Sequence, residues 1–272
     1  MKEKISLAGD LGSGKSTVSN ILIDRLGAEY YSTGKIVRDV AERRGMTVVE
    51  LNKYMETHPE LDHEIDDGLV ALSQDDRLLI IDSRMAWHFT KGTFKVYLST
   101  DIETSAVRIM CANRQGEHAS SLEQTVEQTR ARRESEKKRY FTQYGVNIKD
   151  LTNYDLVIDT TYATPDEVAE RLISGFEKWQ EDRDFKCAYI CPERMLFPER
   201  ELDGELLSEL SEKLDLGEDI GSVEVAEVDG EFYLISGFEA AMAYSLNFET
   251  FIPAQLVKDK PEGEFVRMKN SL

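Results

Sequence analysis

The sequence predicts an α/β fold on a parallel sheet, followed by a smaller α+β unit. Short apolar segments suited to buried strands alternate with long helical stretches through about residue 180. A glycine-rich turn, GDLGSGKS, separates the first of these segments from the first helical stretch. From about residue 185 the pattern changes to alternating strands and shorter helices. We therefore expect two units, at residues 1–180 and 185–272.

Buried parallel strands are expected in the first unit wherever a short apolar segment precedes a helical stretch. These segments are residues 4–8, 29–31, 78–81, 94–98 and 156–158. The helix after the last segment begins at Thr164-Pro165-Asp166-Glu167, a capping box with proline at the first helical position.

The second unit begins with a stretch that leads into a helix, CPERMLFPERELDGELLSEL. Residues 222–237 alternate between apolar and polar around Asp229-Gly230, which is a strong signal for a β-hairpin. A helix is expected over residues 238–247 and a final strand over residues 251–257.

The composition is that of an ordinary globular protein, with 41% hydrophobic residues among 272. Its formal net charge of −19 argues against broad binding to nucleic acid, which requires a basic surface. No apolar run approaches the ~20 residues of a membrane span, and the N-terminus lacks the apolar stretch of a signal peptide. Three scattered cysteines form no disulfide framework, so we expect a cytoplasmic protein.

The glycine-rich turn contains Gly9-x4-Gly14-Lys15-Ser16, a complete phosphate-binding loop signature. Glycines allow successive backbone N–H groups to point at a polyphosphate, and the following helix directs its positive end at the same anion. Lys15 can reach the β- and γ-phosphates, and the Ser16 hydroxyl is placed to bind Mg²⁺. We expect ATP to be held by nine residues: Gly9, Asp10, Leu11, Gly12, Ser13, Gly14, Lys15, Ser16 and Thr17.

Two further clusters follow predicted strands. Ser32, Thr33 and Gly34 form a polar turn after the second strand, and Arg38 lies one helical turn beyond. Asp82 and Arg84 emerge from the carboxyl end of the strand at 78–81, the edge of an open α/β sheet where ligands bind. An acid and an arginine at this place suit a carboxylate linked to Mg²⁺ and a phosphate clamp. The alternative is that Asp82 only forms a turn or caps a helix.

A third cluster is basic in an otherwise acidic chain. Six of the ten residues from 130 to 139 are arginine or lysine. On a helix Arg132, Glu136 and Arg139 share one face, which places a carboxylate between two guanidinium groups. Such a run usually marks a solvated charged helix. Beside a phosphate loop it also fits phosphoryl transfer, which needs fixed positive charge around the migrating group.

The chain resembles the cytidylate kinases, particularly the cytidylate-kinase-like branch found in bacteria and archaea. The stretches that carry the resemblance run in order through about residues 1–180: LAGDLGSGKST, YYSTGKIVRDVAERRGM, LNKYMETHPELDHEID, IIDSRMAWHF, RRESEKKRYFTQYGVN and NYDLVIDTT. The resemblance implies the three-layer fold of P-loop kinases, with an acceptor-binding insert at about 35–72 and a lid at about 112–148. It also implies transfer of the ATP γ-phosphate to CMP or dCMP.

The resemblance further implies roles for individual residues. Arg38, Arg84 and Arg132 would hold the phosphate of the acceptor, while Glu136 and Arg139 would contact the acceptor and the transferring phosphate. Asp82 would join Ser16 at Mg²⁺, and Ser32 and Gly34 would line the acceptor pocket. The catalytic group would comprise Lys15, Asp82, Arg132 and Arg139. Ser83 stands where the enteric enzymes have a glycine and the insert is short, so the base specificity stays open.

The second unit is weakly similar to ParB-like and sulfiredoxin-like proteins, through FPERELDGELLSEL, DGEFYLISGFEAAMAYSLN and IPAQLV. In that superfamily an arginine-bearing helix grips phosphate after a glycine, but here no arginine follows Gly237 until Arg267. We expect this unit to bind a protein partner, mediate dimerisation or pack as an appendage. Two alternatives to a CMP kinase remain: a P-loop kinase of another small acceptor, and a non-catalytic nucleotide sensor acting through the second unit.

Overall fold

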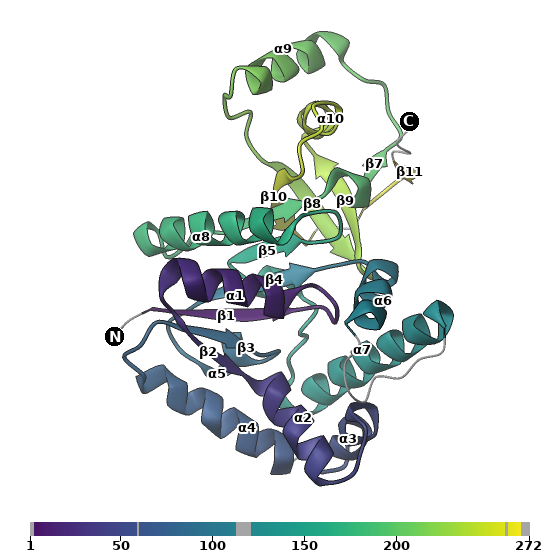
Figure 1. Cartoon of the computed structure of the whole chain (residues 1–272). Helices are drawn as coiled ribbons and strands as arrows, with labels where there is room; N and C mark the ends of the chain where they lie inside the picture. The colour runs from purple at the N-terminus through teal and green to yellow at the C-terminus, as the bar shows by residue number, and fades with distance from the viewer. Residues whose placement is uncertain (1–2, 59, 113–120, 259–260, 268–272) are drawn as a thin grey trace.

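The computed structural model describes residues 3–58, 60–112, 121–258 and 261–267. The strands of these residues form one sheet, in the order β11-β7-β9-β8-β10-β6-β5-β4-β1-β3-β2 (Figure 1). The five strands expected in the first unit are all present and pair in parallel. They are β1 (Lys4–Gly9), β2 (Glu29–Ser32), β3 (Leu79–Asp82), β4 (Thr93–Ser99) and β5 (Leu156–Asp159). The predicted α/β class with a parallel sheet is confirmed.

Helices cover both faces of this parallel part, as a three-layer fold requires. On one face α1 (Lys15–Leu26) and α8 (Pro165–Glu181) pack together over the apolar strand residues. On the other face lie α4 (Glu60–Ala71), the short α5 (Ala86–Phe89) and the C-terminal part of α7 (Leu122–Tyr144). The capping box at Thr164 begins α8 as predicted.

The expected insert is helical and projects from the end of β2. It consists of α2 (Thr33–Arg43), α3 (Val48–Met55) and α4, followed by the 3-10 turn Leu72–Gln74. The expected lid contains α7, which packs against α6 (Ile102–Cys111) and α3. Residues 113–120 of the expected lid lie outside the described residues.

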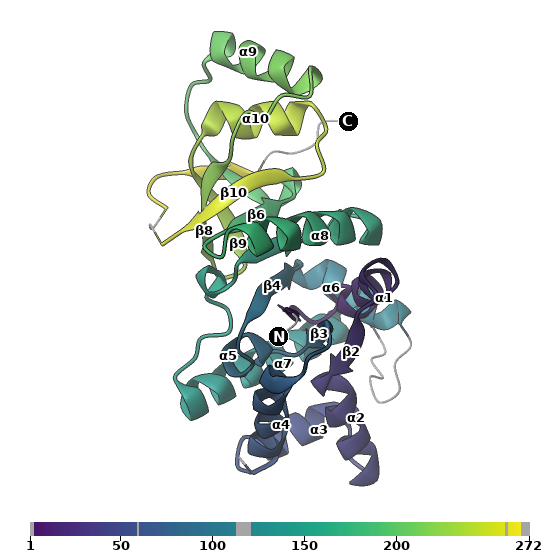
Figure 2. The same cartoon turned by 90° about the vertical axis from the view of Figure 1, so that its left-hand side faces the viewer.

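The C-terminal strands continue the same sheet. β6 (Cys187–Ile190) pairs in parallel with β5 and antiparallel with β10 (Ile252–Val257). The predicted hairpin is confirmed as β8 (Val223–Val228) and β9 (Glu231–Ser236), and the predicted helices as α9 (Gly204–Asp215) and α10 (Phe238–Leu246). β7 (Met195–Pro198) and β11 (Phe265–Arg267) complete the sheet, and the short 3-10 turns are Leu151–Asn153 and Pro192–Arg194. Figures 1 and 2 show α9 and α10 at the opposite end of the molecule from α2 and α3.

A hydrophobic core spans the proposed unit boundary. Tyr97 and Tyr154 of the first unit pack in the same buried cluster as Phe232 and Leu234 of the hairpin. The units proposed at 1–180 and 185–272 therefore share both a sheet and a core. Among the described residues no helix has the length and apolar character needed to cross a membrane.

Candidate active site

The phosphate loop connects β1 to α1 and adopts backbone conformations that favour glycine. Gly12 and Gly14 have φ angles of 74° and 83°. A Cβ atom at Gly12 would lie 2.6 Å from the carbonyl oxygen of Ser105. Lys15 begins α1, and its Nζ donates to the carbonyl oxygens of Gly9 (3.0 Å) and Asp10 (2.7 Å). The amino group is thus held against the loop.

The charge of Lys15 is poorly compensated by the protein. Burial lowers the pKa of Lys15 to about 7, and repulsion by the Arg84 guanidinium lowers it as well. The carboxylates of Asp82, Asp10 and Glu136 offset only part of this effect. An anion at the loop would stabilise the ammonium form, so the site suits polyphosphate.

Asp82 stands at the end of β3, held by side chains from β2 and α2. The Tyr30 hydroxyl donates to Asp82 Oδ2 over 2.8 Å, and Thr33 Oγ1 donates to the Asp82 backbone oxygen over 3.4 Å. Asp82 is buried and lines the same cavity as Ser16. Carboxylate and hydroxyl oxygens are the hard ligands that Mg²⁺ prefers, so this pair fits a magnesium ion.

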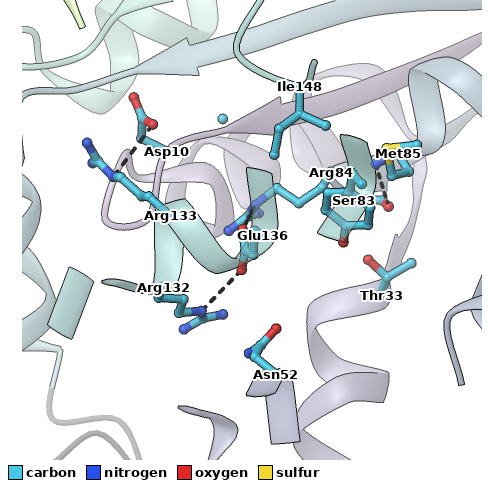
Figure 3. Close-up of polar contacts among 12 residues, drawn as sticks. Asp10, Thr33, Asn52, Ser83, Arg84, Met85, Arg132, Arg133, Glu136 and Ile148 are labelled. Atoms are coloured by element: carbon cyan, nitrogen blue, oxygen red, sulfur yellow. Dashed lines mark hydrogen bonds and ion pairs between the residues drawn. The ribbon is translucent and has the colours of Figure 1, made fainter. Parts of the chain in front are cut away.

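Glu136 on α7 lies between two arginines (Figure 3). Arg84 Nε donates to Glu136 Oε2 at 3.0 Å, and Arg132 Nε donates to Oε1 at 3.2 Å. Burial alone would raise the pKa of Glu136, but the charges of Arg84, Arg132 and Arg139 outweigh it and lower the pKa to about 2. The helical spacing suggested that Arg132 and Arg139 share the carboxylate, but the second hydrogen-bonded guanidinium belongs to Arg84, two residues after the end of β3.

Arg139 instead joins α7 to the insert. Its guanidinium donates to the Asn52 side-chain oxygen (3.2 Å), to the Asn52 backbone oxygen (3.4 Å) and to the Tyr140 hydroxyl (3.2 Å). Arg139 Nε also lies 3.3 Å from Asp62 Oδ2. A further bond of 2.5 Å joins Ser135 on α7 to Glu56 in the insert. The helix α7 is therefore closed onto the insert.

One cavity of about 100 Å³ brings most of the predicted residues together. The phosphate loop lies on one side, and α2, the end of β3 and α7 form the other. Its described lining carries five basic side chains and two acidic ones, although the whole chain is acidic. The predicted residues that line it are Leu11, Gly12, Ser13, Gly14, Lys15, Ser16, Gly34, Arg38, Asp82, Arg84, Arg132, Glu136 and Arg139.

Four predicted residues do not line this cavity. Gly9 lies where no side chain fits, because a Cβ atom there would lie 2.4 Å from the backbone oxygen of Leu98. Thr17 is exposed in the first turn of α1. Ser32 caps α2, its hydroxyl accepting from the Lys35 amide over 3.3 Å. The remaining residue is Asp10.

The Asp10 carboxylate faces β4 and the lid. It accepts from the Tyr97 hydroxyl (2.9 Å) and the Thr100 amide (3.1 Å), and it pairs with Lys149. Burial would raise the pKa of Asp10, but the charges of Lys149 and Arg133 hold it well below its usual range. The side chain thus anchors the phosphate loop from outside the cavity.

Sequence reasoning assigned no role to several other residues at the site. Val37, Asn52 and Tyr140 line the cavity, as does Thr33 of the polar turn after β2. Arg108 on α6 donates to Thr160 O (2.7 Å) and lies 3.5 Å from Gly12 O, so it ties the phosphate loop to the segment after β5. Its position, two turns after the strand at 94–98, was the available signal. Nothing in the pattern of the insert distinguishes Asn52 from an exposed helical residue.

The parallel sheet, the phosphate loop and the arginine-lined cavity opposite it define a kinase-like phosphotransferase of the P-loop class. A comparison with protein families identifies the group more closely. The model of the cytidylate kinase-like family matches residues 4–162, and the chain belongs to that family.

The curated relatives include proteins named as two different enzymes. Cytidylate kinase of Thermoplasma volcanium is 35% identical over 179 residues, which cover 64% of this chain and 92% of the relative. An S-adenosylmethionine-dependent nucleotide dehydratase of Lacinutrix mariniflava is 37% identical over 179 residues, covering 65% of this chain but only 37% of that protein. Among solved structures, shikimate kinase from Bacteroides thetaiotaomicron aligns with 64% of this chain and 98% of its own, at a TM-score of 0.45 and 16% identity. At this score the likeness carries no weight.

Proposed function

We propose that the chain transfers the γ-phosphate of ATP to a nucleoside monophosphate, with CMP or dCMP as the acceptor. The observation that carries the proposal is the cavity in which the phosphate loop faces Arg38 of α2, Arg84 just after β3, and two arginines of α7. A kinase with a phosphorylated acceptor must hold negative charge on both sides of the migrating group. The choice of cytosine rests on the names of curated relatives such as the Thermoplasma volcanium enzyme.

The donor side of the proposed mechanism belongs to the phosphate loop. Its backbone N–H groups and the start of α1 bind the polyphosphate, and Lys15 exchanges its carbonyl partners for phosphate oxygens. Ser16 and Asp82 would hold Mg²⁺, which would neutralise negative charge on the polyphosphate. Tyr30 orients the Asp82 carboxylate for this role.

On the acceptor side the arginines act together. Arg38, Arg84 and Arg132 bind the phosphate of the monophosphate, and bidentate guanidinium contacts place its oxygen in line with the γ-phosphate. Glu136 keeps Arg84 and Arg132 apart and oriented before the acceptor arrives. Arg139 holds α7 on the insert, so the closed lid excludes water that would otherwise receive the phosphate.

The closed arrangement must open during each cycle. The cavity holds about 100 Å³, whereas sites for small molecules hold roughly 300–1,000 Å³. We infer that α7 moves away from α3 to admit the two nucleotides, breaking the contacts of Arg139 with Asn52.

A coupled assay of ADP release tests the proposal with ATP and CMP, dCMP, UMP or AMP as acceptor. We expect turnover that is fastest with CMP or dCMP, is abolished by Lys15→Ala, and shows a raised KM for the acceptor in Arg38→Ala. Lys35→Ala, on the same helix as Arg38 and outside the cavity lining, is the matched control.

Other outcomes would contradict the proposal in distinguishable ways. Turnover with a different monophosphate only would replace the acceptor. ATP binding without turnover of any acceptor would favour the nucleotide-sensing alternative.

A further inference from the structure

A second cavity, of about 350 Å³, lies where the C-terminal hairpin meets the phosphate loop and the lid helix. Its walls include Asp10 of the phosphate loop, Arg133 of α7, Thr100 before α6, Arg194 before β7, and the hairpin turn at Gly230. Its described lining shares no residue with that of the active-site cavity. Figure 3 shows that the neighbouring side chains Arg132 and Arg133 diverge, with Arg133 directed toward Asp10.

Several buried polar atoms in this lining have no hydrogen-bond partner among the described residues. They are Arg133 Nε and Nη2, Arg194 Nε, Thr100 Oγ1 and Asp101 Oδ2. Arg194 and Thr100 are only 3% and 2% exposed. A buried polar group without a hydrogen-bond partner destabilises the fold. Three of these atoms are guanidinium nitrogens, which only donate, and one is a carboxylate oxygen, which only accepts, so the set calls mainly for an acceptor-rich ligand.

The two arginines are fixed by their other contacts. Arg194 donates through Nη2 to the Gly230 oxygen at 2.7 Å and stacks 5.4 Å from the ring centre of Phe232. Arg133 Nε lies 3.7 Å from Asp10 Oδ1, beyond hydrogen-bonding distance. Asp10 is already bound by Tyr97, the Thr100 amide and Lys149, so it does not satisfy Arg133.

Most acidic groups of the lining are engaged elsewhere. Asp101 Oδ1 caps α6 by accepting from the Thr104 amide, and Glu227 accepts from the Gly230 amide. Glu231 pairs with Arg267, as Asp10 does with Lys149. Glu103 and Asp229 are exposed. The buried part of the cavity thus offers guanidinium donors, together with one carboxylate oxygen that fits a hydroxyl donor.

We propose that this second cavity binds a small phosphorylated metabolite that also carries hydroxyl groups, of a size between a sugar phosphate and a mononucleotide. Phosphate oxygens match the guanidinium donors of Arg133 and Arg194. A ligand hydroxyl matches Asp101 Oδ2, and the volume lies within the range of roughly 300–1,000 Å³ for small-molecule sites. The ligand would touch the phosphate loop through Asp10 and the lid through Arg133, so its binding would alter the affinity for nucleotide at the active site.

Calorimetric titration of the full chain with ribose 5-phosphate tests the site. We expect binding to be at least tenfold weaker in Arg194→Gln and in Arg133→Gln, and unchanged in Lys15→Ala and Arg38→Gln. Arg200→Gln is the matched control, since Arg200 belongs to the same unit, pairs with Glu239 and lies outside the lining. Because Arg194 is buried, circular dichroism must show that its variant is folded; Arg133→Gln carries the test if it is not.

Three results would overturn the proposal. One is no detectable binding of ribose 5-phosphate at millimolar concentration. Another is binding that is lost in Lys15→Ala or Arg38→Gln but kept in Arg194→Gln and Arg133→Gln, which would place the probe in the active-site cavity. The third is binding of citrate, a carboxylate probe, in preference to the sugar phosphate. None of these readouts depends on phosphate transfer, so the second site and the proposed kinase activity fail separately.

Discussion

Lys15 is only 9% exposed, and desolvation and the Arg84 charge lower its pKa to about 7. At pH 8 the free protein therefore carries Lys15 mostly neutral, and a bound polyphosphate raises its pKa and draws in a proton. We predict proton uptake on ATP binding at pH 8 and less uptake at pH 6, where Lys15 is already charged. Calorimetry in buffers of different ionisation enthalpy measures this difference.

Two variants assign the proton to this residue. Lys15→Arg stays charged at both pH values, so the uptake attributed to Lys15 should vanish from its binding reaction. Lys35→Met removes an exposed lysine of α2 and should leave the uptake unchanged. A binding heat that does not depend on the buffer in the unmodified protein at pH 8 would contradict the prediction.

The lowered pKa of Glu136 leads to a second prediction, which concerns the pH dependence of stability. Its pKa falls from 4.5 in the unfolded chain to about 2 in the folded protein, because Arg84, Arg132 and Arg139 outweigh the opposing effect of burial. The carboxylate therefore stabilises the fold fully above pH 4.5, and this stabilisation is lost as the pH falls toward 2. We expect the free energy of unfolding to decline more steeply in this window for the unmodified protein than for Glu136→Gln.

Urea unfolding at several pH values measures that slope. Glu134→Gln is the control, because Glu134 lies on the exposed face of the same helix. Equal slopes for the unmodified protein and Glu136→Gln would show that the arginines do not stabilise the Glu136 carboxylate.

Among the elements, the phosphate loop contains two glycines, Gly12 and Gly14, that differ in how closely other backbone approaches them. Gly12 and Gly14 both have positive φ, which costs a non-glycine residue about 1–2 kcal/mol. Only at Gly12 does a Cβ also meet backbone, the Ser105 oxygen at 2.6 Å; at Gly14 the space is open. We predict a larger drop in melting temperature for Gly12→Ala than for Gly14→Ala, measured by calorimetry. Equal decreases in melting temperature would mean that α6 moves away from the added methyl group without loss of stability.

The lid helix gives the second prediction at this scale. Arg139 joins α7 to α3 through Asn52, and the proposed closure depends on that contact. We predict that Arg139→Ala lowers kcat by ~10²-fold, because a lid that is not held on the insert no longer positions the reacting groups and excludes water. Lys138→Ala, at an exposed position of the same helix, should have little effect. Steady-state kinetics with CMP compares them, and an unchanged kcat in Arg139→Ala would remove Arg139 from the mechanism.

At the scale of the whole molecule, the shared core predicts one cooperative unfolding transition. Phe232 of the C-terminal hairpin is fully buried against residues of the first unit. The two tryptophans, Trp87 and Trp179, both belong to the first unit and report on its unfolding. Phe232→Ala should therefore destabilise the transition seen by tryptophan fluorescence, by about 3–5 kcal/mol.

The control for this prediction is Leu216→Ala, a residue of the C-terminal unit that is 70% exposed. It should leave the fluorescence transition in place. If Phe232→Ala changes only a separate transition without tryptophan signal, the two units unfold independently despite the continuous sheet.

The strands and the phosphate loop could be predicted because their signals are local. Residues 4–9 and 156–159 are short apolar runs beside helix signals, and the hairpin turn at Asp229-Gly230 needs only its own backbone angles. The strands β6, β7 and β11 escaped prediction because no turn signal or alternating pattern marks them in the sequence. Their pairing comes from neighbours distant in the chain.

The sequence by itself determined the order of strands and helices, the phosphate loop and most of the residues that surround its cavity. Only the tertiary structure decided which groups pair there: that Arg84 rather than Arg139 shares Glu136 with Arg132, and that Arg139 reaches Asn52. It also decided that Asp10 turns away from the cavity and that the C-terminal unit extends the sheet. The physical reason is that helical and strand periodicity depends on near neighbours, whereas ion pairs and sheet extension depend on residues brought together by folding.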